Sequence, residues 1–217
     1  MSDIFREIDE EVRRERLKKL WEQYANLIIA VAVVIVLGVG GWRLYQWWEV
    51  RQAAEAGGKF EQAVLLSEEG KHQEAAAEFS KLATEGTAGY RTLARFRVAE
   101  QLAAQDPQGA VKAYEALAAD GGIGRPLQDV AEIRAALILI DTAPYQELRT
   151  RLEPLTANER PFRHTARELL ALSAWRAGDQ PATRRWGDLI LTDAQTPANI
   201  RGRVEMLMAV TGGRAKG

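Results

Sequence analysis

A single apolar run from Ala25 to Trp42 constrains this chain more than any other feature of its sequence. Only Asn26 and three glycines interrupt the run. At about 1.5 Å per residue a helix of this length covers roughly 27 Å, close to the thickness of the hydrocarbon core of a bilayer. Aromatic side chains that favour the membrane interface flank the run: Trp21 and Tyr24 at one end, and Trp42, Tyr45, Trp47 and Trp48 at the other. The sequence therefore predicts one transmembrane helix over residues 25–48.

Lysine and arginine predict the orientation of this helix, because they are retained on the cytoplasmic side. The basic residues are Arg6, Arg13, Arg14, Arg16, Lys18 and Lys19 before the run, against Arg43, Arg51 and Lys59 in a similar window after it. We expect residues 1–24 to form a cytoplasmic amphipathic tail and residues 49–217 to form an extracytoplasmic domain. A cleaved signal peptide is the alternative, because Ala54-Glu55-Ala56 is a small-x-small pattern, although this pattern lies far from the apolar run.

Composition excludes several classes of protein for the remaining domain. The chain has 29 basic and 30 acidic residues, and 22 and 23 of these remain after residue 43. This near neutrality argues against nucleic-acid binding. The absence of cysteine excludes a disulfide framework and thiol chemistry, and it is compatible with an oxidising compartment.

The residues after position 60 carry a helical pattern with no alternating strand pattern. Apolar side chains recur at spacings of three and four over residues 60–83, 92–104, 109–119, 129–140, 163–177 and 181–192. Glycine, aspartate and proline punctuate the short gaps between these segments. Short gaps favour antiparallel helical hairpins, so we expect an all-α domain.

Three segments repeat a small residue and an aromatic one four positions apart, and a fourth segment has leucine at both positions. They are Gly70 with Ala75 and Phe79, Asp106 with Ala110 and Tyr114, Leu148 with Leu152, and Gly178-Asp179 with Ala182 and Trp186. The third copy is degraded, because Pro154 falls inside its expected second helix. The spacings of 35, 38 and 34 residues bracket the period of a tetratricopeptide repeat. The pattern predicts a helical hairpin solenoid closed by a helix over residues 197–210, with an irregular helical bundle as the alternative.

The whole chain resembles one protein family. A basic tail, a glycine-bearing span ending Gly41-Trp42-Arg43 and a degenerate tetratricopeptide-like domain resemble the ancillary subunit family of the SecYEG translocon, the YfgM type. Residues 1–14 and 163–179 are similar to the alphaproteobacterial branch of this family. The resemblance implies a single-pass inner-membrane protein with its N-terminus cytoplasmic and its C-terminal domain periplasmic. It also implies a scaffold that associates with the SecYEG translocon and docks chaperones or emerging chains.

No pattern of residues indicates catalysis. His72 and His164 have no second histidine or cysteine at metal-ligand spacing, and we expect both to be exposed turn residues. The glycines from Gly121 to Gly124 lack the Lys-Ser/Thr ending of a phosphate loop. We therefore expect no enzyme activity, no cofactor, no metal and no small-molecule substrate.

A partner-binding surface is the remaining functional prediction. In tetratricopeptide repeats the first helix of each hairpin lines the concave face. The register above assigns to this face Phe60, Val64, Glu68, Arg95, Leu102, Glu168, Leu172 and Arg176, together with Ala99, Ile133 and Leu137. An apolar floor with scattered charges suits recognition of a protein or peptide, although several of these side chains could instead pack between helices. The same anchored array would also suit a coordinator of envelope assembly or cell division.

Overall fold

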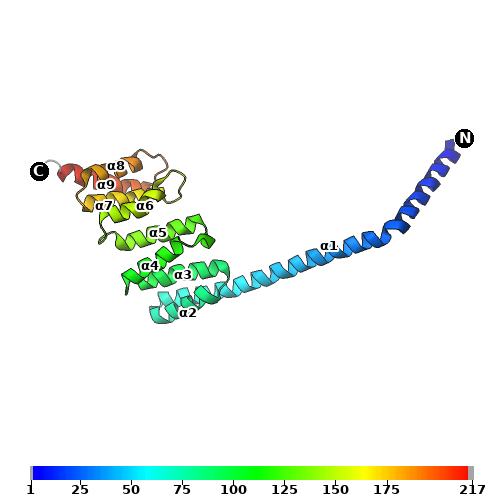
Figure 1. The fold of residues 1–217 in the computed structure, drawn as a ribbon, viewed down its shortest axis with the longest axis horizontal. Coiled ribbons are helices and arrows are strands. Elements are labelled where there is room, and N and C mark those ends of the chain that lie inside the picture. Colours follow the sequence, from blue (N-terminus) through cyan, green and yellow to red (C-terminus); the bar gives the residue numbers. More distant parts are fainter. Residues whose placement is uncertain (1, 215–217) are drawn as a thin grey trace. The chain divides into compact units, whose positions relative to one another are not determined.

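The computed structural model describes residues 2–214, without the side chains of residues 2–13, 15–17, 19–20, 28 and 213–214. Every secondary-structure element in this part of the chain is helical, so the all-α prediction is confirmed (Figure 1). The elements are α1 (Ser2–Glu68), α2 (His72–Glu85), α3 (Ala88–Leu102), α4 (Pro107–Ala118), the 3₁₀ helix η1 (Gly121–Ile123), α5 (Arg125–Leu139), α6 (Tyr145–Leu152), the 3₁₀ helix η2 (Glu153–Thr156), α7 (Arg163–Arg176), α8 (Gln180–Leu191) and α9 (Ala198–Arg214).

The chain divides into two compact units, Met1–Glu55 and Ala56–Gly217, and α1 contributes to both. In the first unit, α1 is the one described helix that is long and apolar enough to cross a membrane. The large apolar side chains that the structure describes between Leu27 and Val50 are exposed, as are the interface aromatics. Among these, the ring of Tyr45 lies 6.4 Å from both Trp42 and Trp48. Length and composition therefore make α1 a candidate membrane span.

The second unit is a stack of helical hairpins (Figure 1). The last residues of α1 pair with α2, α3 pairs with α4, α5 with α6 and α7 with α8, and α9 follows. Alanines with no exposed surface line the helix contacts, among them Ala63, Ala94, Ala131 and Ala166. Such small side chains let helices approach closely and leave few voids between them. The helix predicted over residues 197–210 is present as α9.

Two of the second helices, α4 and α8, start at an aspartate that caps the helix N-terminus. The side chains of Asp106 and Asp179 accept hydrogen bonds from the backbone N–H groups of Gly109 and Ala182, each at 2.9 Å. These bonds satisfy N–H groups in the first turn of each helix, which have no partner within the helix. Gly178 has φ +77° in the preceding turn, a conformation that glycine adopts without strain. These local signals place α4 and α8 where the sequence pattern expects them.

Counting from these N-caps corrects the predicted register of the last repeat. In the first three hairpins, the residues four and eight positions after the N-cap are buried: Ala75 and Phe79, Ala110 and Tyr114, Leu148 and Leu152. In α8 these positions hold Thr183 and Gly187, one residue later than the predicted pair of Ala182 and Trp186. A Cβ on Gly187 would lie 2.6 Å from the sulfur of Met208, so the α9 side chain occupies the space that an aromatic ring fills in α2 and α4. Trp186 is buried as predicted, but one position earlier in the repeat.

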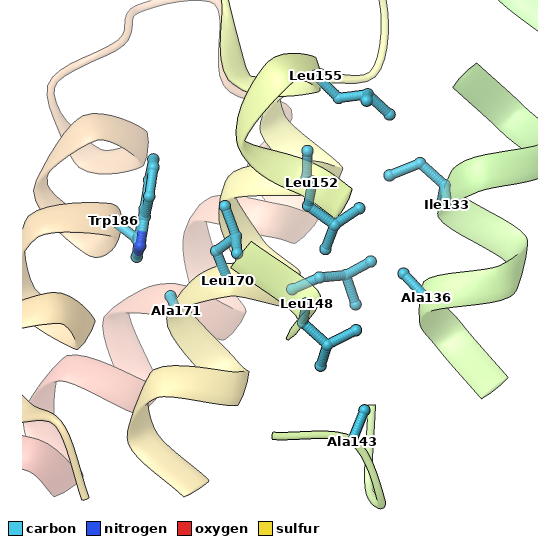
Figure 2. Packing of buried hydrophobic residues seen from close by; sticks show 11 residues of the cluster. Ile133, Ala136, Ala143, Leu148, Leu152, Leu155, Leu170, Ala171 and Trp186 are labelled. Carbon is cyan, nitrogen blue, oxygen red and sulfur yellow. The ribbon is translucent and has the colours of Figure 1, made fainter. Parts of the chain in front are cut away.

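The largest apolar cluster joins the last two complete hairpins. Figure 2 shows Leu148 and Leu152 of α6 lying between Ile133 of α5 and Leu170 of α7. Pro154 ends α6 as its ring predicts, and the chain continues as η2. The shortened third copy therefore still fills the core between its neighbours.

Candidate functional site

The aromatic and aliphatic members of the predicted partner surface on α1 take part in helix packing. The ring of Phe60 lies 5.4 Å from the Phe79 ring and 5.9 Å from the Tyr90 ring. Val64 packs against the same cluster, and both residues are half-buried. Only part of each side chain is therefore open to a partner.

Val64 and Glu68 do lie together, at the mouth of a pocket of about 350 Å³. The pocket is formed by the end of α1, the start of α2 and the last turns of α3. On its wall, Gln101 donates a hydrogen bond to the Ser67 hydroxyl at 3.4 Å. The structure thus brings together two of the predicted residues in a cleft that sequence reasoning did not identify.

Three charged members of the predicted surface make contacts within the array. Arg95 pairs with Asp120 at 2.6 Å, and the hydrogen bond from Arg95 lowers the pKa of this carboxyl below its usual value. Glu168 accepts two hydrogen bonds from the Arg203 guanidinium, at 2.5 and 2.8 Å. Arg176 donates to the backbone carbonyl of Ala143 in the preceding hairpin. These charges are partly used to hold helices and loops together.

Two of the additional residues assigned to the concave face are not available there. Ala99 has no exposed surface, and Ile133 is 7 % exposed in the packing between helices. Leucines at Leu102, Leu137 and Leu172 remain 36 to 45 % exposed on α3, α5 and α7. A shift of one residue along a helix is enough to turn a side chain from the surface into the core.

Buried or half-buried ion pairs recur in the array, and they were not predicted from the sequence. We call each a hairpin clasp: an ion pair between the first helix of a hairpin and the segment that follows its second helix. The clasps join Arg95 of α3 to Asp120, Asp129 of α5 to Arg160, and Arg163, His164 and Arg167 of α7 to Asp193. The polarity is reversed in the middle hairpin, where the helix supplies the acid.

The clasp at Asp193 corrects the prediction that His164 is exposed. His164 is 7 % exposed, and its Nε2 lies 2.9 Å from Asp193 Oδ2. Arg163 and Arg167 donate to the same oxygen at 3.3 and 3.2 Å. The pKa of Asp193 is held well below its usual range, first by the hydrogen bond from the backbone N–H of Gln195 and then by His164. Local sequence patterns do not predict the pairing of His164 with Asp193, because the two residues lie 29 positions apart in the sequence.

Arg167 is the most buried cation of this group, with 5 % of its surface exposed. Besides Asp193, its guanidinium donates to the carbonyl of Thr156, the amide oxygen of Asn158 and the carbonyl of Leu189. A guanidinium with its donors so fully used stabilises structure and has little capacity left for a ligand.

A second, half-buried network surrounds Arg151 on α6. Its guanidinium lies 2.6 Å from Glu115 of α4, 3.7 Å from Glu132 of α5 and 3.4 Å from Glu147. Burial raises the pKa of Glu132, although Arg151 opposes that effect. The glutamates of this network are paired with the Arg151 guanidinium, an arrangement that joins helices and differs from the pairing of a nucleophile with a base in covalent catalysis.

Among the described residues, no cluster of three or more histidine, cysteine, aspartate or glutamate side chains could hold a metal. The charged side chains of the array are instead placed to join helix to helix and helix to loop. The sequence of residues 18–169 matches a family model described as a tetratricopeptide repeat-like domain. The chain belongs to the tetratricopeptide repeat-like family. Domains of this family are typically non-catalytic scaffolds for protein interaction. No curated protein matches the chain, and no solved structure matches it.

Proposed function

We propose that this tetratricopeptide repeat-like protein is a membrane-anchored periplasmic scaffold that associates with the SecYEG translocon and docks chaperones or emerging chains. The observation that supports it best is the combination, in one chain, of an exposed apolar α1 and a helical-repeat array. A tether would raise the local concentration of the array near its partner, so that a weak docking surface would suffice.

The topology that we propose follows the lysine and arginine distribution. Residues 1–24 form the cytoplasmic tail, residues 25–48 the span and residues 49–217 the periplasmic domain. A cysteine introduced at Ser2 should be shielded from an impermeant reagent in intact cells. A cysteine at Ser67 should react once the outer membrane is permeabilised. The reverse labelling pattern would contradict this topology.

We also propose that the protein acts by binding and not by turnover. Its partners are proteins, and neither nucleic acid nor a small-molecule substrate is required. The partner surface comprises the predicted residues that keep exposed area, chiefly Glu68, Leu102 and Leu172.

Co-purification from intact membranes tests the proposal. The full chain should recover SecYEG together with periplasmic chaperones. The double variant Leu102→Glu with Leu172→Glu places charge on the proposed surface and should reduce recovery of chaperone or client at least about fivefold, because each buried apolar contact contributes 1 kcal/mol or more. Leu189→Glu is the matched control, because Leu189 is similarly exposed at 39 % but lies on α8, outside the predicted surface.

Recovery of division or wall-assembly proteins in place of SecYEG would favour the envelope-coordinator alternative. Equal losses in the double variant and in Leu189→Glu would contradict the assigned surface. Circular dichroism of each variant should show unchanged helix content, because all three leucines are substantially exposed.

A further inference from the structure

A second pocket lies at the start of α5 and shares no residue with the predicted partner surface. Its volume is about 390 Å³, and its wall is formed by the end of α4, the first turns of α5, the junction of α6 with η2, and the loop before α7. The charged side chains that line it are Arg125, Arg151, Arg160, Asp129 and Glu132.

The wall of this pocket is built from buried and mutually oriented groups. Asp129 is 2 % exposed, and its Oδ1 accepts a hydrogen bond from Arg160 in the middle hairpin clasp. Arg151 is held by the carboxylates of three helices, as described above, and 24 % of its side chain is exposed. Gln128 is fixed through its amide, which donates to the carbonyl of Ala118 at 3.0 Å. Such a preorganised wall loses little side-chain entropy when a ligand enters.

Three buried polar atoms of these lining side chains have no hydrogen-bond partner among the described residues. They are Oδ2 of Asp129 and the Nε atoms of Arg151 and Arg160. Buried polar groups are nearly always bonded, and each one left unsatisfied costs roughly 1–3 kcal/mol. One acceptor and two donors therefore lack partners around a single pocket. An occupant that supplies both a donor and acceptors would satisfy them after small rotations of the side chains.

The charges around the pocket favour an acidic occupant. Arg125 is exposed and forms no ion pair within the described part of the chain. Three arginines and two acidic side chains line the pocket, so its charged groups carry an excess of positive charge. The pocket also adjoins the start of α5, where Gly124 as N-cap provides no side-chain acceptor for the helix N–H groups.

We propose that this pocket binds an acidic segment of a partner polypeptide, with a side-chain carboxylate accepting N–H groups from Arg125 and Arg160. Guanidinium groups recognise carboxylates through paired, charge-assisted hydrogen bonds. An inorganic oxyanion would supply acceptors to the arginines, whereas the main chain of a polypeptide also carries the N–H donor that Asp129 lacks. The site is separate from the leucine-bearing surface proposed for translocon partners, so either proposal can fail without the other.

Calorimetric titration of the full chain in detergent tests the site with two matched probes. The first is an acetylated, amidated peptide of alternating glycine and glutamate, and the second is the same peptide with glutamine for glutamate. The glutamate peptide should bind about tenfold more tightly, since hydrogen bonds between charged groups contribute about 1.5 kcal/mol or more. Arg125→Gln should weaken its binding about fivefold, by removing one charged donor. Arg184→Gln is the matched control, because Arg184 is an exposed arginine on α8 outside the pocket, and it should leave the affinity unchanged.

A second variant keeps the test decisive. Asp129→Asn retains an acceptor for Arg160 but replaces Oδ2 by an amide N–H, which cannot accept the main-chain N–H of the peptide, so this variant should bind the glutamate peptide less tightly than the native chain does. Equal affinity for the two peptides, or equal losses in Arg125→Gln and Arg184→Gln, would overturn the proposal. Tight binding of inorganic phosphate by a chain that does not bind the glutamate peptide would overturn the assignment to a polypeptide.

Discussion

The first and the last complete hairpins of the array are held closed by different kinds of contact. In the first, Phe60 of α1 packs between the rings of Phe79 and Tyr90. In the last, Asp193 after the end of α8 pairs with His164 and Arg167 in the first turns of α7. Ring packing depends on the apolar area removed from water and tolerates small changes of angle. The clasp depends on charge and geometry, and it should therefore respond to pH.

The largest expected effect comes from removing a buried ring. Phe79 and Trp186 are each 1 % exposed and Tyr114 is 3 % exposed. Truncation of any of the three to alanine should lower the free energy of unfolding by roughly 3–5 kcal/mol, through lost burial and a residual cavity. Denaturant unfolding of the full chain in detergent would measure this loss. If all three variants unfold like the native chain, the packing of the repeats is not as described.

Breaking the clasp at Asp193 should lower the free energy of unfolding almost as much as removing a buried ring. Such a loss would show that charge pairs stabilise the last hairpin about as much as ring packing stabilises the first. Arg167→Met keeps the volume of the side chain and removes its donors. The change removes one of the donors to Asp193 and the Arg167 donors to two backbone carbonyls, and it should cost about 3 kcal/mol. Arg184→Met on the exposed face of α8 is the control and should change stability by less than about 0.5 kcal/mol. A loss in Arg167→Met no larger than that of the control would mean that the clasp is unimportant.

Lowering the pH should change the stability contributed by the clasp of the last hairpin but not that of the ring packing in the first. The pKa of Asp193 is lower in the folded chain than in the unfolded one, so its stabilising effect is present above about pH 4 and is lost as the pH falls. The difference in melting temperature between the native chain and Asp193→Asn should therefore shrink below about pH 4. The difference between the native chain and Phe79→Ala has no such titrating group and should change little over the same range. A constant Asp193→Asn effect down to pH 2 would contradict this account.

The smallest effect concerns the contact between α8 and α9. In Gly187→Ala the new methyl group would meet the flexible side chain of Met208, which can move aside, so we expect a loss of only about 1 kcal/mol. The same substitution in a Met208→Ala background should cost less, since the obstructing sulfur is absent. A double-mutant cycle from thermal unfolding measures this coupling. Equal costs in the two backgrounds would mean that Met208 does not set the register shift of the last repeat.

Local patterns were sufficient for much of the fold. The periodicity of apolar residues predicted helices at α3, α4, α5, α7 and α8. Pro154 correctly indicated the early end of the third hairpin. These signals act over a few residues, where backbone geometry dictates the outcome.

The candidate site was less accessible to sequence reasoning. Leu102 and Leu172 are exposed, and their role in binding stays a prediction, whereas the exposed position expected for His164 was wrong. Arg95 looked like a free groove cation, because its partner Asp120 lies 25 residues away. One signal was available: Asp120 and Asp193 each lie two residues after the end of a second helix. An acid repeated at that position could have suggested a contact with the preceding first helix.

The sequence by itself determined the all-helical class, the repeat period and the candidate span, because each depends on side-chain character repeated along the chain. Only the tertiary structure decided which charges are clasped. Pairs such as Asp129 with Arg160, 31 residues apart, form through the crossing of helices and the path of the following loop. Tertiary packing likewise placed Trp186 one position early, because Met208 of α9 fills the space over Gly187. A rotation of about 100° per helical residue separates a buried position from an exposed one, and neighbouring helices set that rotation.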